Sequence, residues 1–129
     1  MSISRSIKVV DDELELACLF KEFLKNEGYD VVSFTDPVLA LEYFKESADK
    51  HSLIITDLRM PGISGIDLAK SIRQINSKIK IFLMTAFESK DLEDEEYFIN
   101  ARIDLLIQKP VRFSHLRAMI NDALKNLTC

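Results

Sequence analysis

The sequence predicts an α/β fold in which five parallel strands alternate with five helices, the order (βα) being repeated five times. Two observations lead to this prediction. Short apolar runs rich in β-branched residues recur along the chain, and segments with apolar residues at helical spacing separate them. Parallel neighbours need a crossover connection, which is nearly always right-handed, so helices must cover both faces of a doubly wound sheet.

The first two strands are short runs, each followed by a helix. Ile7–Val10 is too short for a helix, and a helical pattern from Leu16 to Leu24 follows it until Gly28 ends the helix. Tyr29–Phe34 is the second strand. Asp36-Pro37 then predicts an N-cap and a first turn. The apolar residues of the helix that follows are Leu41, Phe44 and Ala48.

The third and fourth strands are predicted at Leu53–Thr56 and Ile79–Met84. A loop over Met60–Ser64 separates the third strand from the next helix. The apolar face of that helix consists of Leu68, Ile72 and Ile75. The fourth helix has the weakest pattern and is expected between about Lys90 and Ala101.

The fifth strand is predicted at Leu105–Ile107, and the final helix follows it. That helix has the best-defined apolar stripe of the chain. Its members are Leu116, Met119, Ile120, Ala123, Leu124 and Leu127.

Composition limits the classes of protein to consider. A hydrophobic fraction of 47% suffices for one core, and no linker or repeat divides the chain, so residues 1–129 are expected to form one domain. No apolar stretch approaches the roughly 20 residues of a membrane helix, and Met1–Lys8 does not resemble a signal peptide. A cytoplasmic protein is therefore predicted. The net charge of -4 argues against direct binding to nucleic acid, and Cys18 and Cys129 lack the spacing of a zinc or redox site.

Polar residues suited to phosphoryl chemistry follow four of the five predicted strands. They are Asp11 and Asp12 after the first strand, Asp57 after the third, Thr85 after the fourth and Lys109 after the fifth. Open parallel sheets bind ligands beyond the carboxyl ends of their strands, so these five side chains are expected to converge. Taken singly, each has an ordinary explanation as a turn former, a helix cap or a surface amine. The joint pattern predicts a site.

Three carboxylates in one cleft require a counter-ion. Two unit charges about 4 Å apart repel by roughly 4 kcal/mol at an effective dielectric near 20, and Mg²⁺, which prefers oxygen ligands, removes that penalty. Asp57 is the candidate nucleophile, because carboxylates form aspartyl phosphates and this one leads into a turn with Pro61, Gly62 and Gly65. Lys109 would supply positive charge to the phosphoryl oxygens, and the hydroxyl of Thr85 could bond one of them.

These residues resemble the response regulator receiver domain of two-component signalling over about Ile7 to Asn126. The motifs that carry the resemblance are Val9-Val10-Asp11-Asp12-Glu13, Asp57-Leu58-Arg59-Met60-Pro61 with Gly65, Thr85-Ala86 and Lys109-Pro110. The resemblance implies a flavodoxin-like fold with strand order 2-1-3-4-5. It also implies that Asp57 accepts a phosphoryl group from a histidine kinase or phosphotransfer protein, and that the chain then signals to a downstream effector.

The resemblance further assigns roles within the site. Asp12 would bind Mg²⁺ directly, Asp11 mainly through water, and the backbone carbonyl of Arg59 would complete the protein ligands. Lys109 would bridge to the phosphoryl group, with the Lys109-Pro110 peptide bond cis. Arg59 and Phe87 are bulky at positions that tune phosphate lifetime in the family, which predicts slow self-dephosphorylation.

Three departures from the family pattern fall on its signalling face, formed by the fourth helix, the fifth strand and the fifth helix. Leu106 replaces the usual switch aromatic, the interval from Thr85 to Lys109 is about two residues longer, and Asn100-Ala101-Arg102 replaces the customary Gly-Ala. An acidic run between Glu88 and Glu96 is explained by a solvated helix face or by a docking surface. In the second case, Arg112 and Arg117 would pair with it across a phosphorylation-dependent homodimer.

Three other functions compete with this interpretation. A haloacid-dehalogenase-like phosphatase is disfavoured because Arg59 stands two residues after Asp57, where that class has an acid. A flavin-binding module is suggested by the fold alone, and Asp11 and Asp12 would repel an FMN phosphate. The last is a degenerate receiver that docks without phosphorylation, which Leu106 suggests and the retention of all five site residues opposes.

Overall fold

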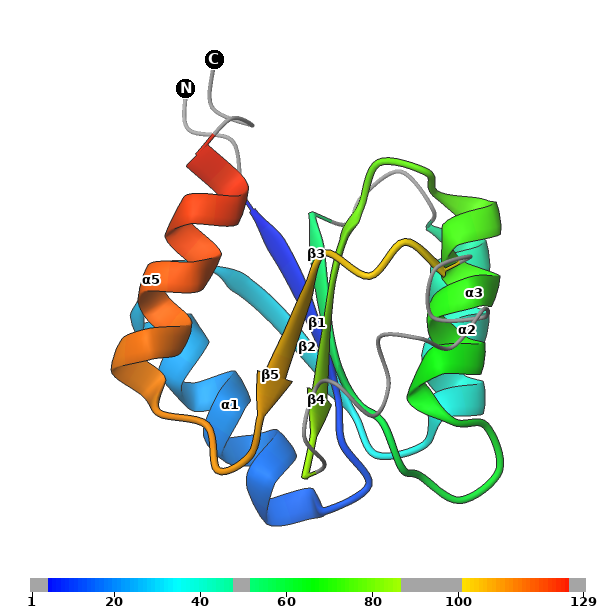
Figure 1. Ribbon diagram of the computed structural model, residues 1–129, viewed down its shortest axis with the longest axis horizontal. Helices are drawn as coiled ribbons and strands as arrows, with labels where there is room; N and C mark the ends of the chain where they lie inside the picture. The colour runs from blue at the N-terminus through cyan, green and yellow to red at the C-terminus, as the bar shows by residue number, and fades with distance from the viewer. Residues whose placement is uncertain (1–4, 48–51, 87–100, 126–129) are drawn as a thin grey trace.

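The computed structural model describes residues 5–47, 52–86 and 101–125 and confirms the predicted α/β architecture. The strands pair in parallel in the order β2-β1-β3-β4-β5. Helices α1 and α5 cover one face of the sheet, and α2 and α3 cover the other (Figure 1). The elements are β1 (Ser6–Val10), α1 (Leu14–Asn26), β2 (Asp30–Phe34), α2 (Pro37–Glu46), β3 (Leu53–Asp57), α3 (Gly65–Ile75), β4 (Lys80–Thr85), β5 (Leu105–Gln108) and α5 (Phe113–Leu124).

Strand boundaries differ from the prediction by one residue at several ends. β3 includes Asp57, and β4 begins at Lys80 and includes Thr85. The fourth helix predicted for about Lys90 to Ala101 falls on residues 87–100, which lie outside the described residues. No helix in the described part of the chain is both long enough and apolar enough to cross a bilayer.

The core is divided into two layers by the alternation of side chains along the strands. Ile7 and Val9 of β1 pack against α1 and α5, whereas Val10 packs against α2 and α3. Lys8 points to the same face of the sheet as Val10 and is a charged residue in this otherwise apolar layer. Its side chain is buried, with Nζ 2.6 Å from Ser6 Oγ and 5.3 Å from the ring centroid of Tyr43.

The predicted helix ends are confirmed where side chains or glycine fix them. Asp36 accepts a hydrogen bond of 2.9 Å from the amide of Val38 at the start of α2, and Pro37 occupies the first helical position. Ser64 caps α3 by accepting from the amide of Asp67 at 3.1 Å. Gly28 follows the end of α1 with φ of +96°, a left-handed conformation that glycine adopts without strain.

Side chains join α1 to α5 across the edge of their layer. Arg117 Nε lies 2.6 Å from Glu27 Oε1, and the guanidinium also sits over the ring of Phe23. Phe23 stacks on Phe113 with ring centroids 4.6 Å apart. Within the described residues Arg117 is therefore engaged inside its own chain. The homodimer pairing suggested for it concerns an acidic run that lies outside them.

Candidate functional site

The register of the sheet brings the ends of β1 and β3 side by side. Val10 pairs with Thr56, so that Asp11 and Asp57 are the next residues along each strand. Asp11, Asp57 and Lys109 each follow by two residues a strand residue that packs against α1 and α5. Period-two alternation therefore directs all three side chains to the same side of the sheet edge.

Backbone hydrogen bonds hold this edge in place. The amide of Leu58 donates to the carbonyl of Met84 at 2.9 Å, and the amide of Lys109 donates to the carbonyl of Thr85 at 2.8 Å. On the other side of the site, the amide of Asp11 donates to the carbonyl of Phe34 at 3.0 Å. The loops that carry the candidate residues are thus extensions of the rigid sheet.

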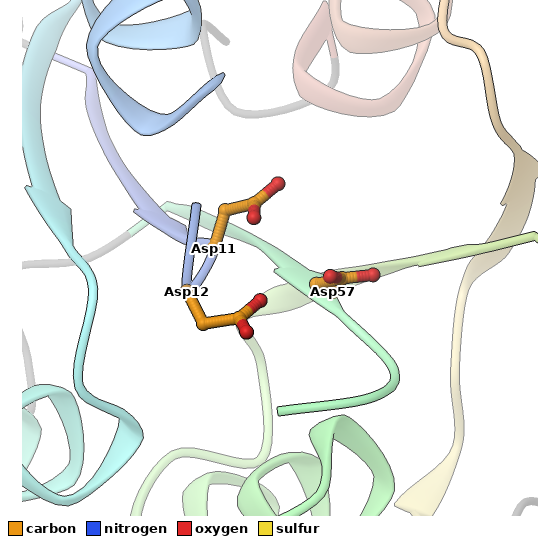
Figure 2. A group of neighbouring side chains, drawn as sticks. All are labelled: Asp11, Asp12 and Asp57. Carbon is orange, nitrogen blue, oxygen red and sulfur yellow. The ribbon is translucent and has the colours of Figure 1, made fainter. Parts of the chain in front are cut away.

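Three carboxylates meet at this edge. Asp11 and Asp57 are buried and Asp12 is exposed, and each offers an oxygen within 4.8 Å of those of the other two. Figure 2 shows Asp11 and Asp12 extending from the end of β1 beside Asp57 at the end of β3. One oxygen of Asp11 accepts from the amide of Glu13, and one of Asp57 accepts from the amide of Leu58, both at 3.0 Å.

Lys109, just beyond the end of β5, provides a positive charge beside these carboxylates. Its Nζ lies 3.2 Å from Asp57 Oδ2 and 3.4 Å from Asp11 Oδ2, so one ammonium serves two carboxylates. Its side chain is 20% exposed, which leaves it open to a group that enters the cleft. Ionised together, the three acids and Lys109 carry a net charge of about -2 in a partly desolvated cleft.

The pKa values reflect this imbalance of charge. Burial raises the pKa of the Asp57 carboxyl above 3.8, and Asp11 adds to the rise, although Lys109 and the amide of Leu58 oppose it. Burial alone would lower the pKa of Lys109, but the charges of Asp11 and Asp57 outweigh it and raise that pKa. Lys109 therefore stays protonated beside the two carboxylates.

The donor set fits a hard divalent cation. Carboxylate oxygens from Asp11, Asp12 and Asp57 lie close enough together to share one ion, and oxygen is the ligand that Mg²⁺ prefers. The set contains no sulfur or imidazole, which a zinc site would favour. A cation at this position would favour the ionised form of Asp57, whose pKa is raised by burial and, to a smaller extent, by Asp11.

Gly65 lets α3 approach the backbone of Asp57. A Cβ built on Gly65 would overlap the carbonyl oxygen of Asp57 and would lie 2.9 Å from Leu83 Cδ1. The amide of Gly65 donates to the carbonyl of Leu58 at 2.7 Å, which closes the loop after β3. The sequence predicted Gly65 only as a turn residue. The structure gives it a steric role in setting the position of Asp57.

The remaining predicted residues lie at the same edge. Thr85 is buried at the end of β4, one residue beyond Met84, the register partner of Asp57. Arg59 follows Asp57 by two residues and has an exposed side chain. The peptide bond between Lys109 and Pro110 is cis, as the family resemblance implied. The roles predicted for these residues in phosphate and metal binding remain predictions.

Comparisons with known proteins agree with this geometry. The family model described as "Response regulator receiver domain" matches residues 7–121. The phosphoglycerate transport system transcriptional regulatory protein PgtA of Salmonella typhimurium is 34% identical over 93% of this chain. The match covers 28% of PgtA, so the chain spans less than a third of the length of this relative.

Two solved structures are close in fold. A CheY-like response regulator receiver domain protein from Methanospirillum hungatei has a TM-score of 0.86 at 25% identity, with 96% of each chain covered. The response regulator TrrA from Thermotoga maritima, solved in complex with Mg(2+)-BeF, has a TM-score of 0.79 at 33% identity. That comparison covers 93% of this chain and 99% of TrrA.

Proposed function

Because this chain belongs to the response regulator receiver domain family, we propose that it accepts a phosphoryl group from a histidine kinase or phosphotransfer protein on Asp57. The observation that carries the proposal is the pairing of Asp57 with Lys109 inside a cluster of three carboxylates. One oxygen of Asp57 is held by the amide of Leu58, while the other faces the ammonium. The residue is thus oriented and partly desolvated, as a nucleophile must be.

In the proposed step, a carboxylate oxygen of Asp57 attacks the phosphorus of a phosphohistidine. The new P–O bond forms as the P–N bond breaks, and the imidazole leaves with the electron pair and takes up a proton. Such transfers have a loose transition state with charge spread over the phosphoryl oxygens. Lys109 stabilises that charge through the ammonium that otherwise pairs with Asp57.

The proposal includes Mg²⁺ held by Asp11, Asp12, Asp57 and the backbone carbonyl of Arg59. TrrA, the relative solved with Mg(2+)-BeF, supports this choice of ion. When bound, the ion supplies the positive charge that three carboxylates and one lysine lack. Asp11, which is fully buried and paired with Lys109, keeps that lysine directed at the site.

The output of the switch is proposed to run through Thr85 to the β5 and α5 side of the domain and from there to an effector protein. The hydroxyl of Thr85 would bond a phosphoryl oxygen only after transfer. Residues 1–129 are proposed to act as one receiver domain in the cytoplasm, with self-dephosphorylation slow because Arg59 and Phe87 restrict water. A phosphorylation-dependent homodimer stays part of the proposal.

Intact mass provides the direct test. Incubation with Mg²⁺ and a small phosphodonor should give one phosphoryl adduct on the wild type and on Asp67→Asn, a control at an exposed acid of α3. Asp57→Asn should give none, and removal of Mg²⁺ should abolish the adduct on the wild type. An adduct on Asp57→Asn contradicts the assignment, and no adduct on any protein favours the docking module.

The lifetime of the adduct tests the slow hydrolysis separately. Phosphate release from the purified phosphoprotein should be slow at neutral pH, because Arg59 and Phe87, which lies outside the described residues, are bulky at positions that tune phosphate lifetime in the family. A half-life of seconds contradicts this part of the proposal and leaves the assignment of Asp57 intact.

A further inference from the structure

A cavity at the opposite end of the sheet from Asp57 collects cationic side chains. It has a volume of about 310 Å³ and lies where α3 leads into β4, next to the start of β5. Four cations line it, namely Arg73, Lys78, Lys80 and Arg102, against one carboxylate, Asp104. The ionised lining therefore carries a charge of about +3, in a protein whose net charge is -4.

The guanidinium of Arg73 is not available to a ligand, because the protein uses it fully. It donates to four backbone carbonyls and lies 3.3 Å from Asp104 Oδ2. The carbonyls belong to Ser77, Ile79, Ala101 and Arg102. The second role of Asp104 is to accept from the amide of Ile81 at 2.7 Å. Arg73 and Asp104 thus form the rigid floor of the cavity.

The other three cations are not compensated. Within residues 5–47, 52–86 and 101–125, the side chains of Lys78, Lys80 and Arg102 form no ion pair. Burial lowers the pKa of Arg73, and the like charge of Arg102 adds to this lowering against the opposing effect of Asp104. An anion in the cavity would relieve that repulsion, which gives the cluster a reason to bind one.

A second cavity adjoins the first and shares Lys80 and Asp104 with it. Its volume is about 340 Å³, and besides Lys80, Asp104 and Asp122 its lining is apolar and comes from β4, β5 and α5. The apolar residues are Phe82, Leu105, Met119 and Ala123. An occupant of the basic cavity could therefore extend an uncharged part along this neighbouring surface.

We propose that the basic cavity binds a polyphosphate anion, whose phosphates contact Lys78, Lys80 and Arg102. Three uncompensated cations around about 310 Å³ match a compact chain of phosphates better than a single monovalent anion. The site lies beyond the amino ends of β4 and β5, whereas the carboxylate cluster lies beyond the carboxyl ends of the strands. Two sources share this chemistry, an inorganic polyphosphate and a nucleoside triphosphate. Only the nucleoside triphosphate would use the adjoining cavity.

NMR titration of the full chain tests the proposal. Inorganic triphosphate and ATP are added separately to ¹⁵N-labelled protein at low salt, in buffer stripped of divalent cations so that the carboxylate cluster cannot recruit them. The amide signals of Lys78, Ile79 and Arg102 should shift, and those of Glu13 and Leu58 should not. Binding should weaken as salt rises. Tighter binding of ATP, with shifts at Leu105 and Met119, identifies a nucleotide, and equal binding identifies the inorganic anion.

Two charge-matched variants distinguish binding in the basic cavity from nonspecific electrostatic attraction of the anion. Lys78→Gln/Lys80→Gln/Arg102→Gln should weaken binding at least tenfold. Lys25→Gln/Lys45→Gln/Arg112→Gln removes the same charge from exposed positions elsewhere and should weaken it less than twofold. Equal losses in the two variants, or shifts centred on Leu58, would overturn the proposal. Asp57→Asn should bind like the wild type, so this result does not depend on whether Asp57 is phosphorylated.

Discussion

The carboxyl and amino ends of the parallel sheet both gather like charges, but the amino end also holds a buried charge that the chain pairs fully. At the carboxyl end, Asp11, Asp12 and Asp57 share the single ammonium of Lys109. At the amino end, the buried guanidinium of Arg73 has a partner for each of its three nitrogens. Where the chain supplies all the partners of a buried charge, removal of that charge leaves the partners unsatisfied and destabilises the fold. A cluster that lacks its counter-charge marks a place where a ligand is expected.

The largest effect is expected at Arg73, the fully paired charge of the amino end. Arg73→Met should lower the free energy of unfolding by about 3–5 kcal/mol, because it removes the ion-pair partner of Asp104 and leaves buried backbone carbonyls without their donor. Urea denaturation measures the loss. Gln74→Met, at the neighbouring exposed position of α3, should change stability by less than about 0.5 kcal/mol. A loss of similar size in both variants would mean that the hydrogen bonds of Arg73 do not stabilise the amino end of the sheet.

A smaller effect on stability, with a second effect on the site, is expected from Gly65→Ala. The added methyl group must displace α3 from the carbonyl of Asp57, which should cost about 1–3 kcal/mol. The free energy of unfolding, measured by urea denaturation, and the yield of the phosphoryl adduct should both fall. Ser71→Ala, on the same helix, is the control. An unchanged adduct yield in a destabilised Gly65→Ala protein would separate the helix contact from the chemistry of Asp57.

The carboxyl end was predictable from the sequence because each of its residues lies at the end of a strand or just beyond it. An apolar run followed by Asp57 or Lys109 gives both the element and the position of the side chain beyond it. The amino end was not predictable in this way. Arg73 lies inside a helix and reaches carbonyls up to 29 residues away, and no local pattern encodes those contacts. Lys8 likewise interrupts an apolar strand without signalling that its amine is buried.

The carboxylate cluster at the carboxyl end of the sheet should make stability depend on pH, in the direction set by the raised pKa of Asp57. Above pH 3.8 the unfolded chain loses the proton of this carboxyl, while the folded chain retains it up to the raised pKa. Without divalent cations, stability should therefore fall as pH rises through that window. Each pKa unit of elevation corresponds to about 1.4 kcal/mol.

Urea denaturation of Asp57→Asn across the same pH range isolates this contribution. The variant should lack the fall and should be more stable than the wild type by about 1 kcal/mol near neutral pH. Added Mg²⁺ should reduce the difference, because a cation bound by the carboxylates stabilises the folded wild type. Parallel pH profiles for the two proteins would show that Lys109 already compensates Asp57.

The smallest effect concerns Arg102, the one non-glycine residue with a positive φ in the part of the chain that the structure describes. Its φ of +52° lies in the left-handed region, which disfavours a residue with a Cβ. Arg102→Gly removes that strain and should raise the free energy of unfolding by about 0.5–1 kcal/mol. Arg102→Gln removes only the charge that repels Arg73, so its gain should be smaller. Equal gains in urea denaturation would assign the whole effect to charge. In that case the repulsion between Arg102 and Arg73, which the proposed anion would relieve, is what lowers stability at the amino end.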